Sequence, residues 1–142
     1  MAIAERIRND AAIAEEKIPV AVEEELSASS GRQVIVYLIG REAPRERQSI
    51  SAGTRTRFLV RFSIMCYAFA LQFPRAMELR DDLLGRVEVA LMKEPRTFGR
   101  AEVFSSWLDG GEFENARGEA GTVSFMSCAE VSLVVEVEST IA

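Results

Sequence analysis

The pattern that most constrains this chain is a strict alternation of side chains along residues 122–138 near its C-terminus. Successive side chains of a β-strand point to opposite faces of a sheet, so a period of two over this length predicts a long, half-buried strand. The apolar face would carry Val123, Phe125, Ser127, Ala129, Val131, Leu133, Val135 and Val137. The other face would carry Thr122, Ser124, Met126, Cys128, Glu130, Ser132, Glu136 and Glu138. The chain is therefore expected to contain a β-sheet.

Three more segments predict strands, at residues 33–39, 54–70 and 100–108. The first is a continuous β-branched and aromatic run, as expected of a strand buried on both faces. In the second, alternate residues from Phe58 to Ala68 would face the core. The remaining residues of that strand are half apolar, which fits either packing against a helix or a subunit interface.

Two segments predict helices, at residues 2–16 and 74–93. Pro19 and Pro95 end them, and Pro74 occupies a first turn, where proline is favoured. The second helix has an apolar stripe made of Leu79, Leu83, Val87, Ala90 and Leu91. Its solvent-exposed face would carry Arg80, Asp81, Asp82, Arg86 and Glu88. Residues 20–26 fit either one or two helical turns or a short edge strand.

The order helix, strand, strand, helix, strand, strand predicts an α+β fold in a single domain over residues 1–142. We expect a four-stranded, mainly antiparallel sheet with the helices packed on one face, because consecutive strands without a helical crossover are antiparallel neighbours. Polar connections are expected at residues 40–53 and 112–121, with a turn at Asp109-Gly110-Gly111.

Composition excludes much catalytic chemistry, because the chain has no histidine and only two cysteines. A Ser-His-Asp triad, a His-ligated zinc and a four-cysteine zinc site are all impossible. Cys66 and Cys128 are expected to be small apolar residues near a core, with a disulfide left open. No phosphate loop is present, and no apolar run approaches the roughly 20 residues of a membrane span. We therefore expect no enzyme, no catalytic residue, no metal, no cofactor and no membrane partner.

Charge is unevenly distributed along the chain, whose net charge is −5. Residues 41–61 hold six arginines against two glutamates, whereas residues 102–142 hold eight acidic residues against one arginine. The basic segment fits either a solvated loop or a contact surface for a negative partner, such as nucleic acid or the acidic end of an identical neighbour. The residues predicted to lie at a subunit interface are Arg41, Arg45, Arg47, Arg55, Arg57, Arg61, Tyr67, Glu112, Glu114, Glu130 and Glu136.

With these elements in order, the chain resembles the tail terminator (minor tail) subunits of long-tailed bacteriophages and related particles. The resemblance lies in residues 3–8 (IAERIR), 34–37 (VIVY), 56–62 (TRFLVRF), 79–91 (LRDDLLGRVEVAL) and 129–137 (AEVSLVVEV), and it covers most of the chain. The best match runs from Asp81 to Leu91, followed by a long loop and a paired C-terminal strand.

The resemblance implies a structural virion subunit that forms a ring, expected to be hexameric, at the head-proximal end of a tail tube. Such a ring stops tube polymerisation and joins the tube to the head connector. Its partners would be identical subunits, the tail tube protein and the head–tail connector protein, and nucleic acid would only pass through the ring lumen. It would be assembled in the host cytoplasm and reside in the virion. A head–tail connector or neck subunit, a small ligand-binding or regulatory α+β domain and an enzyme remain as alternatives.

Overall fold

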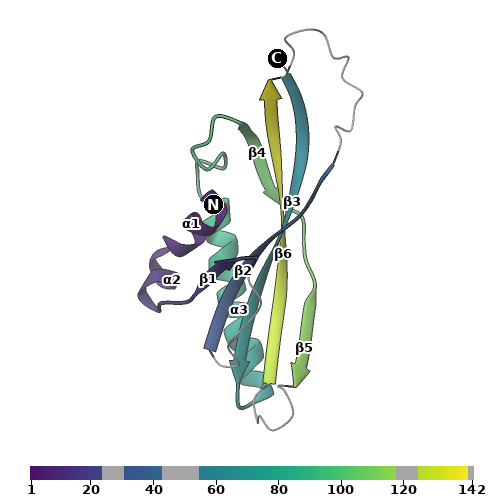
Figure 1. Cartoon of the computed structure of the whole chain (residues 1–142). Helices are drawn as coiled ribbons and strands as arrows, with labels where there is room; N and C mark the ends of the chain where they lie inside the picture. Colours follow the sequence, from purple (N-terminus) through teal and green to yellow (C-terminus); the bar gives the residue numbers. More distant parts are fainter. Residues whose placement is uncertain (24–30, 43–54, 118–124, 141–142) are drawn as a thin grey trace.

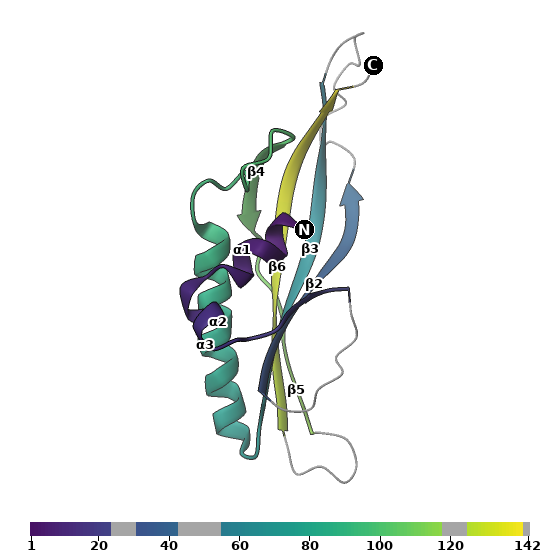
Figure 2. The ribbon, with the colours of Figure 1, turned by 60° about the vertical axis from the view of Figure 1, so that its left-hand side comes forward.

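The computed structural model describes residues 1–23, 31–42, 55–117 and 125–140, and it has a mixed sheet with helices against it. The described elements are α1 (Ala2–Arg8), α2 (Ala11–Glu15), β1 (Val20–Val22), β2 (Gly31–Glu42), β3 (Arg55–Ala70), α3 (Phe73–Met92), β4 (Val103–Leu108), β5 (Phe113–Arg117) and β6 (Phe125–Thr140). The α+β class is confirmed, but the prediction of four strands is wrong: the sheet has six. Figure 2 shows α3 lying along one face of this sheet.

Two strands of 16 residues each, β3 and β6, form the centre of the sheet. They pair antiparallel over their full length, from Arg55 opposite Thr140 to Ala70 opposite Phe125. The alternation along residues 122–138 thus predicted the dominant strand, although 122–124 lie outside the described residues. The strand order is β1-β2-β3-β6-β4, with β5 also paired to β6.

Strand β1 settles the ambiguity at residues 20–26 in favour of a short edge strand, over Val20–Val22. It runs parallel to β2, with Val20 opposite Val34 and Val22 opposite Val36, so the sheet is mixed. Proline at position 19 suits this place, because Pro19 contributes only its carbonyl, which accepts a hydrogen bond from the Val34 N–H at 2.9 Å.

The expected turn at residues 109–111 is instead a bulge between two strands that share β6. Strand β4 pairs with the C-terminal half of β6, and β5 pairs with the N-terminal half, with Phe113 opposite Ala129. Hydrogen bonds from Asp109 N to Ser132 O (2.7 Å) and from Ser132 N to Gly110 O (2.8 Å) carry the ladder through the bulge. Part of the predicted 112–121 loop is therefore the edge strand β5.

Glycine is required at this bulge for two different reasons. Gly110 has φ +75°, a backbone conformation that residues with a Cβ adopt only at an energetic cost. Gly111 lies against the β6 backbone so closely that a Cβ there would be 1.6 Å from the Glu130 carbonyl oxygen. The two glycines thus allow the bulged segment to lie directly against the backbone of β6.

The predicted N-terminal helix over residues 2–16 is two short helices. The break falls at Asn9 and Asp10, and the Asp10 carboxylate caps α2 by accepting a hydrogen bond from the Ile13 N–H at 3.3 Å. Helix α3 agrees with the predicted range to within one residue at each end. One residue of α3 contradicts the prediction: Arg80, predicted on the solvent-exposed face, is only 6% exposed.

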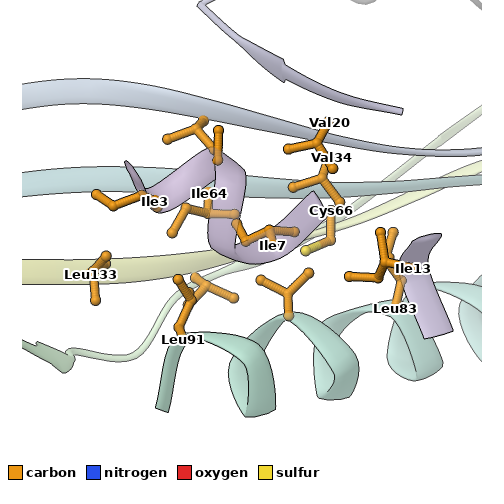
Figure 3. Packing of buried hydrophobic residues seen from close by; sticks show 14 of the residues in the cluster. Ile3, Ile7, Ile13, Val20, Val34, Ile64, Cys66, Leu83, Leu91 and Leu133 are labelled. Carbon is orange, nitrogen blue, oxygen red and sulfur yellow. The ribbon is translucent and has the colours of Figure 1, made fainter. Parts of the chain in front are cut away.

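The core lies between the sheet and the three helices (Figure 3). Ile64 and Cys66 of β3 are fully buried there, and Phe62 packs at the margin, as the even-numbered alternation predicted. The buried members of the cluster are Ile3, Ala4, Ile7, Ile13, Ile18, Val20, Val34, Val36, Ile64, Cys66, Leu83, Val87, Leu91, Val131, Leu133 and Val135.

Candidate functional site: the distal strip of the sheet

The long central strands extend beyond the helices at one end of the molecule (Figure 1). We call this region the distal strip and define it as residues 38–42 of β2, 55–62 of β3, 133–140 of β6 and 103–108 of β4. Much of the predicted interface set falls here, namely Arg41, Arg55, Arg57, Arg61 and Glu136. Arg45 and Arg47 lie outside the described residues, and of Arg55 only the backbone is described.

Arg61 links three segments of the sheet through ion pairs. Its Nε lies 2.6 Å from Glu42 Oε1 on β2, and its Nη1 lies 2.9 Å from Asp109 Oδ2 at the bulge. The hydrogen bonds to Glu42 and Asp109 raise the pKa of the Arg61 guanidinium above its ordinary value. The cation is therefore held within its own chain.

The other described arginines of the strip also contact groups of the same chain. Arg57 Nη1 lies 3.6 Å from Glu136 Oε1, and its Nε lies 3.9 Å from Glu138 Oε2. The Arg41 guanidinium lies 5.2 Å from the centroid of the Phe58 ring, a cation–π distance. The basic and acidic segments that the sequence offered for attraction between neighbours thus meet within one subunit.

The remaining predicted interface residues lie away from the distal strip. Tyr67 and Glu114 flank Cys128 in register across three strands, and burial raises the pKa of the Tyr67 hydroxyl. Glu130 accepts a hydrogen bond from the Ser63 hydroxyl at 2.7 Å. Glu112 lies at the start of β5, where its carbonyl accepts from the Glu130 N–H. The predicted set is therefore two groups and not one surface.

The two cysteines are free thiols on opposite faces of the sheet. Cys66 is opposite Ala129, while Cys128 is opposite Tyr67, the next residue of β3, so the two side chains point apart. Burial raises the pKa of the Cys66 thiol to about 12 and also raises the pKa of Cys128. The opposite faces exclude a disulfide between them, and the raised pKa values favour the protonated thiol at neutral pH.

Arg80 is buried against β6 and β5, in contrast to the exposed position that the sequence pattern predicted. Its guanidinium donates to the Ser127 hydroxyl (2.9 Å) and to Asp81 Oδ1 (2.8 Å), and it lies 4.4 Å from the centroid of the Phe113 ring. Ser127 in turn donates to Asn115 at 2.5 Å. Arg80 thereby fixes the edge strand β5 to α3. The helical spacing of 80 with 83 and 87 was a signal that it lies on the buried stripe.

A second ion-pair network joins the middle of α3 to β2 and to Glu16 at the end of α2. Glu16 pairs with Arg32 and, at 3.1 Å, with Arg86, while Asp82 pairs with both arginines at 3.3 and 3.0 Å. Desolvation favours the neutral form of Glu16, but the hydrogen bonds and charges of Arg32 and Arg86 outweigh it and lower the pKa of this carboxyl. This network stabilises the junction of the two layers.

A half-open pocket of about 220 Å³ lies beside β4, between this strand and the C-terminal end of α3. Its apolar lining comes from Leu91, Met92, Trp107, Leu108 and Leu133, and Ser106 and Arg96 also line it. The Ser106 hydroxyl donates to the Arg96 carbonyl at 2.7 Å, which holds the connecting segment beside the strand.

Within the part of the chain that the structure describes, no cluster of three or more His, Cys, Asp or Glu residues could hold a metal ion. In the same residues, no helix is both long and apolar enough to cross a membrane.

No protein-family model matches this chain, and no curated protein matches it either. Among solved structures, a chain of the structure titled "Virion of native gene transfer agent (GTA) particle" is similar, with a TM-score of 0.62 and 17% identity. The alignment covers 96% of this chain and 92% of that chain. This chain shares its fold with a chain of that virion structure. At that identity the similarity concerns the fold, which extends over nearly the whole length of both chains.

Proposed function

We propose that this protein is a structural subunit of a phage-like particle and that it acts without catalysis. The observation that carries the proposal is the near-complete overlap with a chain of a gene transfer agent virion. The match covers 96% of this chain and 92% of the other, so the shared fold extends over nearly the whole of both. The resemblance to tail terminators, found from the sequence independently, names the same class of particle.

Within that particle we propose a ring at the head-proximal end of the tail tube, which caps the tube and joins it to the head connector. A ring needs two different surfaces on each subunit that fit one another. Arg57 and Arg61 are ion-paired with Glu136, Glu42 and Asp109 of their own chain, so these two arginines contribute little to the attraction between charged flanks that the sequence suggested.

The experiment is to delete the gene in a particle-producing strain and image the products by electron microscopy. A tail terminator is expected to leave tubes of uncontrolled length, since nothing stops polymerisation. A head–tail connector, the alternative position, would leave tubes of normal length detached from filled heads. Intact, functional particles after deletion would overturn the structural role altogether.

Location in the particle supplies a second measurement. An epitope tag at the N-terminus, where Met1 is 44% exposed, would be labelled with antibody on purified particles. We expect label at the junction of head and tail, whereas label along the tube or at its far tip contradicts the proposed position.

A further inference from the structure

The distal strip ends in two strand edges on opposite sides of the molecule, as Figure 2 shows for β2 and β4. On the β2 side, β1 covers only Val34–Val36, and the Glu23 carboxylate then accepts the Leu38 N–H at 3.0 Å. From Ile39 to Glu42, no strand among the described residues lies beside β2 on that side. On the other side, β4 pairs with β6 alone within the same described part of the chain.

The two edges lie at the same level of the sheet, and their strand directions allow them to pair. The register places Leu38, Phe62, Leu133 and Leu108 in one row across the four strands, so β2 and β4 reach the same level. Each neighbouring pair in this strip is antiparallel, and four strands therefore leave β2 and β4 running in opposite directions. A second copy placed alongside without turning over would set its β4 antiparallel to β2, with the same face toward the helices.

Apolar side chains at the two edges also correspond. Leu38 and Ile39 are 51% and 63% exposed on the β2 side. Leu38 is directly opposite Phe62 and so lies on the face that α3 covers. The half-open pocket beside β4 lies on that same face, because Leu91 of α3 and Leu133 of β6 line it. One edge thus presents an apolar projection and the other an apolar recess.

We propose that β2 of one subunit pairs with β4 of the next, so that Ile39 lies within the paired edge and Leu38 of the first subunit enters the pocket beside β4 of the second. The sheet then continues from subunit to subunit around the ring. This inference rests on the proposed ring and names the surfaces that form it.

We infer that a second copy of this chain occupies each edge, because the β2 edge and the β4 edge are complementary in strand direction and in apolar shape. Two β2 edges brought together would place projection against projection, so the contact is head-to-tail and not a two-fold dimer. Open strand edges with exposed apolar residues favour unwanted pairing, and a protein normally shortens, charges or covers them. Here Arg57 and Arg61 are paired within the chain, which leaves the backbone edges and apolar side chains for the neighbour.

The test is cross-linking of the double variant L38C/M92C with a short bismaleimide, in solution and on purified particles. The two positions lie on opposite edges of a subunit, so their reaction reports a contact between subunits. We expect a ladder of covalent multimers on a denaturing gel, with no ladder from L38C or M92C alone. The native thiols do not interfere, because Cys66 and Cys128 are 0% and 1% exposed.

A second variant, Ile39→Lys, should abolish ring assembly measured by native mass spectrometry. Its control is Leu71→Lys, which changes an equally apolar and more exposed residue, at 74%, in the turn between β3 and α3, and it should leave assembly intact. A ladder from L38C alone, or normal assembly of I39K, would overturn the strand pairing while leaving the ring. Absence of the wild-type chain from particles, together with a monomer in solution, would overturn the ring itself.

Discussion

The bulge at Gly110 and Gly111 offers the sharpest test of the fold. We predict that Gly111→Ala lowers the free energy of unfolding by about 3 kcal/mol, although it adds only one methyl group. A Cβ at this position would lie 1.6 Å from the Glu130 carbonyl oxygen and 2.6 Å from its carbon, and backbone atoms cannot yield as a side chain would. The bulge must therefore move away from β6.

The magnitude follows from the hydrogen bonds lost in that movement. Three backbone bonds hold the bulge to β6: Asp109 N to Ser132 O, Ser132 N to Gly110 O, and Glu130 N to Glu112 O. A typical net contribution of about 1 kcal/mol for each bond gives the total of about 3 kcal/mol.

Urea unfolding followed by circular dichroism measures the change, and two other glycines supply controls. Gly110→Ala meets nothing within 4 Å but keeps φ +75°, so it should cost only about 1 kcal/mol. Gly85→Ala, in the exposed part of α3 with open space around it, should stabilise by up to about 1 kcal/mol. If Gly111→Ala were no worse than Gly110→Ala, the close approach to β6 would be refuted.

Three further predictions concern single side chains. Arg80→Met should lower stability by about 2 kcal/mol in thermal unfolding, because it removes charged hydrogen bonds at a buried site, and Arg80→Lys should not restore it; full stability of the Met variant would contradict the role given to this residue. The folded pKa of Cys66 is about 12 against an ordinary value of 9.0, so its contribution to stability should be constant below about pH 8 and fall by about 1 kcal/mol between pH 9 and 10. Cys66→Ala should flatten this fall, and an equal slope in both proteins would refute the assignment. Arg61→Gln should speed hydrogen exchange of the amides at residues 40–42 with little change in melting temperature, since the ion pairs it removes are exposed, and unchanged exchange would show that they do not hold β2.

The sequence predicted those parts of the fold whose local pattern and tertiary role agree. The long alternation of residues 122–138 and the stripe of α3 are both imposed by burial against the core, so each appears directly as a periodicity. The edge strand β5 has no such pattern, because Phe113 is 61% exposed and the flanking residues are polar. Its strand conformation comes from pairing with β6, which no local window contains.

The sequence shows the arginines of the candidate site but not their partners. It marks Arg57 and Arg61, since six arginines in 21 residues stand out by count. It could not show that Glu136 and Glu42 lie beside them, because that follows from strand register. The apolar edge residues Leu38 and Ile39 were taken for part of a buried strand, and only the short length of β1 reveals that they extend beyond its cover.

The self-contained ion pairs of the distal strip have a consequence for when subunits join. Arg57 and Arg61 are paired with acidic groups of their own chain and add little to the positive field, so these two residues do not draw copies together from a distance. Contact between strand edges is short-ranged and demands correct orientation, which makes spontaneous encounters slow. Such a subunit could accumulate without premature closure and then add quickly once a growing structure holds its neighbour in place.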